Sequence, residues 1–591
     1  MSRSIIKKTI GIGSSTLLSR VFGYIREVLL MQLLGIGIIS DAFFIAFRVP
    51  NSLRKVFAEG ALSSVLVPAL INAEKERGAA GTNKLLTASF IVIEAIVSLL
   101  VVFIYFFSYF IVHRVAPGAS PEQLITSVKL LRILSSFILF LSSSSVLAAA
   151  LQASHRFFIP ALAPALLNCA YVASLIVCLY YSLSVEAFCW SMILASCLNL
   201  LLHVCVFIFY KFKFVRPDAQ AWAGLKLILL QLLPCLLSVG IGEINFWIDS
   251  GFVSYLQDGT FSLLRYAYQM VNIPLGVIAT SLSMVLLPHF SKIGNSKKEL
   301  GAYLTEAIKF IIWMMLPITM IMMISSRAIF ETMFFSSKFS MNNVLHAQSN
   351  MNAYLVGLVF FALEKILLNA FFVLKPHVLR PHEVVYDNIY DNKDFCHLLV
   401  AVKKQEGSLI KVITNAFKIV TIVIKSAYKN LLLFLETIPP VSFATIVAAM
   451  TIGMNFLMNR WLMGIYGGMG LALATSISAG VRVVMLVVIL LYYFKVVFNM
   501  AELWKLIRNY CLQLIILGSM FYGSVVAVTH VINSLLWSWT IHIGAWQIVF
   551  DAHFFLHSFG YWLWFGPLSA IFCFALYTTR KIFNISFSYL D

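Results

Sequence analysis

Hydrophobic residues in this chain fall into long runs that are separated by short polar segments. Most runs are roughly 20 to 30 residues long with few charges, and about 20 apolar residues let an α-helix cross the ~30 Å hydrocarbon layer of a membrane. The pattern therefore predicts an all-α polytopic membrane protein with about fourteen transmembrane helices. The predicted spans are 10–34, 40–71, 85–112, 130–151, 157–183, 185–210, 227–256, 262–290, 308–326, 353–374, 441–461, 465–494, 507–532 and 556–579.

Composition and charge agree with this pattern. Of the 591 residues, 61% are hydrophobic and 12% are charged, whereas soluble domains carry about 25% charged residues. A soluble globular enzyme is therefore excluded. Lys and Arg are more frequent in the loops after even-numbered spans, so the positive-inside rule predicts that both termini are cytoplasmic. The first apolar stretch contains Arg20 and Arg26 and has no clear cleavage site, so we expect no cleavable signal peptide.

An internal repeat indicates how the spans are grouped. The segment 62–68, LSSVLVP, resembles 282–288, LSMVLLP, and six spans separate the two ends. Parallel repeats of this kind occur in transporters whose substrate site lies between two lobes, although chance similarity of apolar sequence is an alternative. We therefore expect two six-helix lobes and two C-terminal helices. The predicted units are an N-terminal lobe at 1–215, a C-terminal lobe at 216–375 and 440–500, an insertion at 376–439, and two added helices at 501–591.

The insertion has its own pattern. Within 409–436, Lys411, Asn415, Lys418, Lys425 and Lys429 fall on one face of a helix that is otherwise apolar. This pattern predicts a basic amphipathic helix that lies in the inner leaflet and binds anionic phospholipids. An extra membrane span is the alternative, and the row of lysines argues against it.

The first two spans contain most of the charges at membrane depth. Ser19, Gly23 and Arg26 share one helical face. The second span has Asp41, Arg48, Ser52, Lys55 and Glu59 at helical spacing, with Arg54 one residue to the side. Charges inside a membrane are costly and usually face water, a partner or a substrate.

The balance of these charges indicates their role. Five cations oppose three acids, Asp41, Glu27 and Glu59. Internal pairing of Arg20 with Glu27 or Glu59, and of Arg48 with Asp41, is one interpretation, but it leaves positive charge over. We therefore predict a cationic cavity for an anionic substrate. Arginine matches phosphate oxygens with two parallel hydrogen bonds and stays charged, which favours a diphosphate head group.

Several motifs resemble those of one transporter family. They are Ser19-Arg20-x-x-Gly23-x-x-Arg26-Glu27, Asp41-Ala42-Phe43-Phe44-x-Ala46-Phe47, Pro50-Asn51-x-x-Arg54-Lys55-x-Phe57-Ala58-Glu59-Gly60-Ala61, Arg156-Phe157-x-Ile159-Pro160-Ala161-x-Ala163-Pro164-x-Leu166-Leu167-Asn168 and Leu286-Leu287-Pro288. They are similar to the MurJ/MviN lipid II flippases of the multidrug/oligosaccharidyl-lipid/polysaccharide exporter superfamily.

The resemblance implies both a function and a set of site residues. It implies a flippase that moves undecaprenyl-diphosphate-linked peptidoglycan precursor, lipid II, to the outer face of the bacterial inner membrane by alternating access, in peptidoglycan and cell-wall biosynthesis. It also implies cavity arginines at Arg20, Arg26 and Arg54. Asp41, Asn51 and Glu59 would support them. Cell-wall synthases are then candidate partners.

The eighth span departs from the family pattern. Family members often carry an Asp-Arg pair in this span, and the corresponding stretch of this chain is Tyr266-Ala267-Tyr268-Gln269. Arg265 lies one helical turn before Gln269, and we expect it to supply the missing cavity cation.

A second group of polar residues suggests a coupling ion. Asp249, Asn455, Asn459 and Thr475 lie in the predicted seventh, eleventh and twelfth spans and offer oxygen ligands suited to Na⁺. Hydrogen bonding between helices is the alternative. Coupling to H⁺ or to the membrane potential remains open, and the sequence supports no firm metal site.

Three other functions are alternatives to a lipid II flippase. An exporter of another polyprenyl-diphosphate-linked glycan or a drug antiporter of the same superfamily would share the architecture, but the surplus cations argue against cationic drugs. A polytopic glycosyltransferase would need a catalytic carboxylate in an external loop, and no recognisable motif is present there. No nucleotide-binding motif, cofactor motif or nucleic-acid-binding signature is found.

Overall fold

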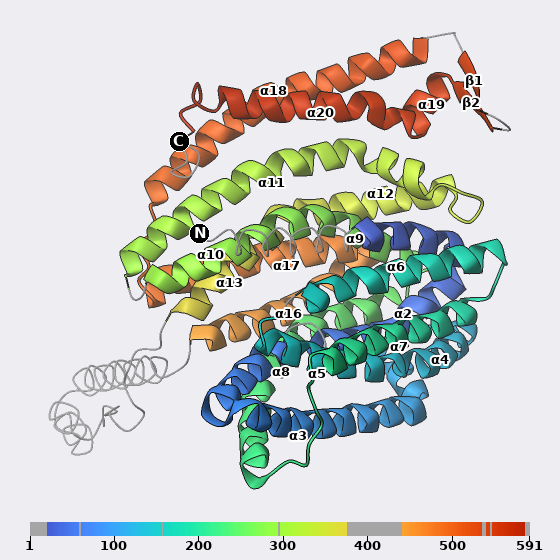
Figure 1. The fold of residues 1–591 in the computed structure, drawn as a ribbon. Helices are drawn as coiled ribbons and strands as arrows, with labels where there is room; N and C mark the ends of the chain where they lie inside the picture. The colour runs from blue at the N-terminus through green and yellow to red at the C-terminus, as the bar shows by residue number, and fades with distance from the viewer. Residues whose placement is uncertain are drawn as a thin grey trace, which may run out of the picture.

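A computed structural model describes residues 21–57, 61–156, 158–293, 296–374, 440–534, 539–543 and 546–585 (Figure 1). The described chain is helical apart from its loops and one antiparallel hairpin of β1 (Trp539–Ile543) and β2 (Trp546–Phe550). The predicted class, an all-α polytopic membrane protein, is confirmed, and the hairpin is an addition that the hydrophobic pattern did not indicate.

The helices before residue 210 pack into one group, which we call the N-terminal lobe (Figure 1). Residues 21–34 form a helix that precedes them. The members of the lobe are α2 (Ile38–Phe57), α3 (Ala61–Val115), α4 (Pro121–Ser135), α5 (Phe137–Ala153), α6 (Phe158–Tyr180) and α7 (Val185–Phe209).

A second group, the C-terminal lobe, follows α8 (Ala219–Val253), which packs against both α3 and α16. Its members are α9 (Thr260–Pro274), η1 (Leu275–Ala279), α10 (Thr280–Ile293), α11 (Lys297–Phe334), α12 (Met341–Val356), α13 (Leu358–Val373), α16 (Pro440–Tyr466), α17 (Gly468–Val488) and η3 (Ile489–Tyr493). The domain boundaries given above stay predictions, and the insertion at 376–439 with its predicted lysine-striped helix lies outside the described residues.

Two more long helices follow the C-terminal lobe. They are α18 (Met500–Ser534) and α20 (Gly560–Thr579), with the short α19 (Ala552–His557) between them. Figure 1 shows the pair beside α11. The hydroxyl of Tyr510 donates a hydrogen bond to the backbone oxygen of Trp313 over 2.6 Å, and Phe565 is buried in the same apolar cluster. The pair is therefore attached to the C-terminal lobe through α11.

The boundary between the second and third predicted spans was wrong. The expected polar loop at 72–84 is helical on both sides of Gly78, whose φ of 62° breaks α3. Good helix formers fill this stretch, among them Glu74, Lys75 and Arg77, and glycine adopts a positive φ without steric cost. Charged residues therefore marked a helical extension here and not a loop.

Nine helices in the described ranges are long and apolar enough to cross a membrane, or ten if α12 and α13, bent by 42°, form one span. The predicted count of fourteen and the side of the termini stay predictions. The helix α2 is 20 residues long but carries Asp41, Arg48, Arg54 and Lys55. These charges lower its mean hydropathy, so α2 is not one of the nine helices counted above.

Candidate substrate cavity between the lobes

A cavity of about 100 Å³ lies where α2 meets α8, α9, α12 and α17. Three basic side chains, those of Arg48, Lys55 and Arg265, line it together with one acidic side chain, that of Asp249. The other lining residues are Asn51, Phe246, Ser250, Val253, Phe261, Leu264, Tyr268, Tyr354 and Leu471. The cavity is therefore cationic and is built by helices of both lobes.

Arg48 is the most unusual of these cations. Its guanidinium carbon lies 5.5 Å from the ring centre of Phe246 and 5.4 Å from that of Phe261. Among the described residues it has no hydrogen-bond or ion-pair partner. Aromatic rings stabilise a cation but leave the five N–H donors of arginine unused. Arg48 is thus positioned to bind an anion that enters the cavity.

Asp41 does not pair with Arg48, so that interpretation of the sequence was wrong. Its carboxylate is 2% exposed and accepts hydrogen bonds from the backbone N–H of Gly259, over 2.7 Å, and of Ser262, over 2.9 Å. The hydroxyl of Ser262 donates to it as well. A carboxylate at the N-terminus of a helix satisfies backbone donors and the helix dipole. Asp41 therefore caps α9 and is not among the residues that line the cavity.

Lys55 has an acidic partner at the edge of the cavity. Its ammonium lies 2.8 Å from one oxygen of Glu243 on α8, and the hydroxyl of Ser52 donates to the other oxygen over 2.6 Å. The indole N–H of Trp247 donates to Ser52 over 3.3 Å. Because this pair neutralises Lys55, most of the positive charge available to a ligand comes from Arg48 and Arg265.

Arg265, which was expected to supply the missing cavity cation of the eighth span, lines the cavity and lies beside a buried acid of the first predicted span. Its guanidinium is 3.5 Å from Glu27, which also pairs with Arg26 at 2.6 Å. Arg26 donates a second hydrogen bond to Asn168 on α6 over 2.8 Å. The structure thus brings Arg26 and Arg265 to one buried carboxylate. Their binding of substrate stays a prediction.

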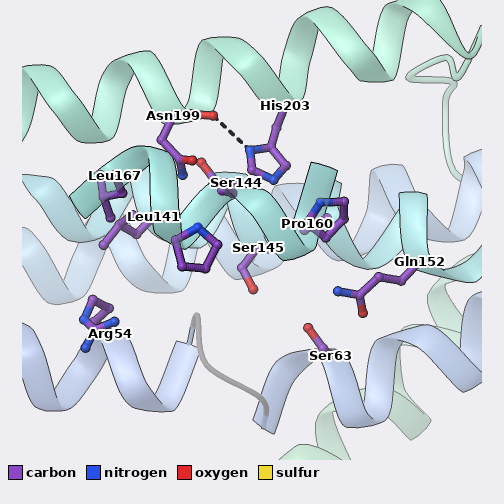
Figure 2. A pocket seen from close by; sticks show the side chains of 13 residues that line it. Arg54, Ser63, Leu141, Ser144, Ser145, Gln152, Pro160, Leu167, Asn199 and His203 are labelled. Atoms are coloured by element: carbon purple, nitrogen blue, oxygen red, sulfur yellow. Dashed lines mark hydrogen bonds between the residues drawn. The ribbon is translucent and has the colours of Figure 1, made fainter. Parts of the chain in front are cut away.

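The remaining predicted cavity residues divide into three groups. Asn51 lines the cavity between the lobes and accepts hydrogen bonds from Nε and Nη2 of Arg54 at 3.2 and 3.1 Å. Arg54 lines a separate cavity inside the N-terminal lobe, shown in Figure 2. Arg20 and Glu59 lie outside the described residues. The predicted arginines are therefore spread over two neighbouring cavities.

The polar residues proposed to hold a coupling ion do converge. Asn455 and Asn459 each donate a hydrogen bond from their amide nitrogens to Oδ1 of Asp249, over 2.8 and 2.6 Å. Thr475 interacts with Asp249 from α17. The carbonyl oxygen of buried Asn459 has no hydrogen-bond donor in the described part of the chain. Polar side chains of α16 and α17 therefore meet one carboxylate of α8, and the two asparagines turn their amide N–H groups toward it.

A protein-family model decides what kind of transporter this is. The model described as "Lipid II flippase MurJ" matches residues 30–376, which is more than half of the chain. The chain belongs to the MurJ family. A curated relative, "Probable lipid II flippase MurJ" of Buchnera aphidicola subsp. Schizaphis graminum, is 32% identical over 390 residues, with 62% of this chain and 73% of the relative covered.

Solved structures give the same architecture. A MurJ flippase in an inward closed conformation has a TM-score of 0.68 and 22% identity, and the match covers 97% of this chain and 99% of that one. An inward-facing multidrug resistance MATE transporter of the MOP superfamily has a TM-score of 0.58 and 13% identity, with 80% and 94% of the two chains covered. At these identities the likeness shows the fold. It confirms a MurJ-like transporter architecture.

In this MurJ-family chain, Arg48 and Lys55 belong to the five cations whose surplus predicts a cavity, but the family motifs assign a site role to neither of them, and Glu243 was not among the expected site residues. Arg48, Ser52 and Lys55 are spaced by four and three residues, so they share one face of α2, and this signal was visible. Arg54 is turned to a different side of the same helix. Because α2 is in contact with both lobes, the spacing alone could not tell which of its sides meets the cavity.

Proposed function

We propose that this chain moves lipid II from the cytoplasmic to the outer face of the bacterial inner membrane by alternating access of its two lobes, without covalent chemistry. Membership of the MurJ family supports this substrate, and the cationic cavity between the lobes supports this route. The diphosphate of the lipid binds Arg48 and Arg265, while the polyprenyl tail stays in the bilayer. The lobes then rock about the bound head group.

The single observation that carries the proposal is the position of Arg48. A half-buried guanidinium without an anionic partner is costly at membrane depth. In this chain the cost is offset only partly by the rings of Phe246 and Phe261. A diphosphate supplies the missing acceptors in the planar geometry that arginine prefers. The same surplus of cations disfavours cationic drugs as substrates.

We infer that a monovalent cation drives the cycle. Asp249, Asn455, Asn459 and Thr475 are the residues that would hold Na⁺, and the unpartnered oxygen of Asn459 is the group that most needs one. A hard cation prefers such carboxylate and amide oxygens. The site lies beside the substrate cavity, because Asp249 lines both. Cation binding and head-group binding can therefore influence each other through one side chain.

The proposal extends to the surroundings of the protein. Both termini face the cytoplasm, and the lysines of the insertion contact anionic phospholipids of the inner leaflet. The cell-wall synthases that consume lipid II at the outer face are the partner class that this direction of transport requires. Each of these points is testable separately from the transport itself.

The decisive experiment uses the full-length protein in vesicles that contain lipid II in both leaflets. A membrane-impermeant enzyme that modifies the head group reports how fast the lipid of the inner leaflet becomes accessible. We expect the protein to speed lipid II exchange but not that of a phosphatidylglycerol probe. Equal rates in protein-free vesicles would overturn the proposal, and faster exchange of a different polyprenyl-diphosphate glycan would replace lipid II by that substrate.

A further inference from the structure

A second cavity, which we call the N-lobe pocket, lies inside the N-terminal lobe and is not explained by the charges between the lobes. Its volume is about 150 Å³. Side chains of α2, α3, α5, α6 and α7 line it (Figure 2). The polar members are Arg54, Ser63, Ser144, Ser145, Gln152, Asn199 and His203. Such a polar concentration is unusual inside a membrane-embedded bundle, where polar groups require partners.

The chemistry of the N-lobe pocket differs from that of the cavity between the lobes. Arg54 is its one basic side chain among the described lining residues, and the other polar groups are neutral hydroxyls, amides and an imidazole. Groups of this kind both donate and accept hydrogen bonds. They match a ligand that carries hydroxyl and amide groups and little charge. A second phosphate or a multiply charged peptide would meet too few cations here.

Asn199 indicates that a ligand is missing from the pocket. Its side-chain oxygen is buried and has no hydrogen-bond donor within the described ranges. The backbone oxygen of the same residue is used by Nδ1 of His203, at 2.9 Å, as the dashed line in Figure 2 shows. A buried acceptor left unpaired costs free energy. Figure 2 also shows Ser63, Ser145 and Gln152 pointing toward a common space.

The two cavities lie on different sides of α2 and are joined by one side-chain contact. Arg54 lines the N-lobe pocket, Asn51 lines the cavity between the lobes, and the two side chains are hydrogen-bonded at 3.1 and 3.2 Å. A ligand that had a diphosphate attached to an uncharged polar group could therefore place one part in each cavity. A space of 150 Å³ holds roughly ten waters. It suits a single sugar ring and not a whole head group.

We propose that the N-lobe pocket binds an acetamido sugar of the lipid-linked glycan while the cavity between the lobes holds the diphosphate. This assignment rests on the proposed function. Ring hydroxyls pair with the serines and Gln152, and the N–H of the acetamido group donates to the oxygen of Asn199. The pocket therefore makes the protein selective for glycan-bearing lipid over bare polyprenyl diphosphate.

The test compares two probes, lipid II and undecaprenyl diphosphate, as ligands of the full-length protein in nanodiscs. The variant Asn199→Leu keeps the side-chain volume and removes the acceptor. We expect it to weaken lipid II binding by about tenfold, the effect of roughly one lost hydrogen bond, and to leave undecaprenyl diphosphate binding unchanged. Ser196→Ala is the matched control, because Ser196 lies on the same helix but outside the pocket and bonds to Met192.

The outcomes separate this inference from the proposed function. Failure of the wild-type protein to bind either probe contradicts the proposed function. Binding of both probes with equal affinity, or an unchanged preference in Asn199→Leu, overturns the sugar pocket alone and leaves only a hydrated polar gap. If Asn199→Leu loses both ligands through misfolding, Gln152→Leu on α5 decides: a retained preference for lipid II refutes the pocket, and a selective loss supports it.

Discussion

The guanidinium of Arg265 lies 3.5 Å from the carboxylate of Glu27, which joins α9 to the helix of residues 21–34. Glu27 is fully buried and is shared with Arg26, so two cations meet one acid. One oxygen of Glu27, Oε2, has no hydrogen-bond donor among the described residues. Because one carboxylate neutralises only one of the two arginines, net positive charge remains next to the cavity. This remaining charge is available to bind an anionic substrate.

Replacement of Arg265 tests whether this side chain binds the substrate or only neutralises Glu27. We expect Arg265→Ala to slow lipid II exchange in vesicles by about tenfold or more, because one of two arginines for the diphosphate is lost. Glu27 keeps Arg26 as a partner, so the protein should still fold. If Arg265 only neutralised Glu27, the double variant Glu27→Gln/Arg265→Ala would recover transport. Recovery would contradict a binding role.

Arg48 gives a sharper test because it has no ionic partner to lose. We expect Arg48→Ala to reduce exchange by at least about a hundredfold with little change in thermal stability, since removal of a half-buried charge that has no ionic partner relieves desolvation. Arg48→Lys should retain part of the activity, because a lysine keeps the charge but not the bidentate geometry. Arg132→Ala is a suitable control, since Arg132 contacts Ser108 and Tyr105 and does not line either cavity. A marked loss of stability in Arg48→Ala would indicate a structural role instead.

Two contacts show how much of the site the sequence could predict, the cluster around Asp249 and the cap formed by Asp41. The convergence of Asn455 and Asn459 on Asp249 followed from oxygens at i and i+4 facing a lone acid, and the structure brings them together. The cap that Asp41 forms on α9 could not be foreseen, because it joins positions 218 and 221 residues apart and depends on how the lobes meet. Local spacing therefore predicted which residues share a helix face, whereas the partner of that face came only from the tertiary structure.

Acid should weaken the link between α3 and α8 at a residue outside the spans. The backbone N–H of Ala221 and the ammonium of Lys84 hold the pKa of Asp218 below its usual value. A lowered pKa in the folded state means that the contribution is fully present above the unfolded value and is lost as the pH falls through the folded value. We expect the melting temperature of Asp218→Asn to depend less on pH below about pH 4 than that of the wild type. Identical pH profiles would show that the link does not contribute.

If the residues around Asp249 bind a cation, Asn459→Asp should lower the melting temperature without Na⁺ and raise it with Na⁺. A network of hydrogen bonds alone does not predict this reversal. Asn459 donates to Asp249 over 2.6 Å, so Asn459→Asp places two carboxylates in contact. Without Na⁺ their repulsion should lower the melting temperature. With Na⁺ the added negative ligand should bind the ion more tightly, and an ion at about 100 times its dissociation constant stabilises the fold by roughly 2.7 kcal/mol.

The measurement is a thermal melt of wild type and Asn459→Asp in NaCl and in choline chloride at equal ionic strength. Thr451→Ser serves as a control, because Thr451 lies on the same helix and bonds to Arg482 through its hydroxyl. We expect Na⁺ to raise the melting temperature of Asn459→Asp more than that of either other protein. If the variant melts at a low temperature in both salts, the cluster binds no cation, and the polar side chains around Asp249 only hold α8 against α16 and α17.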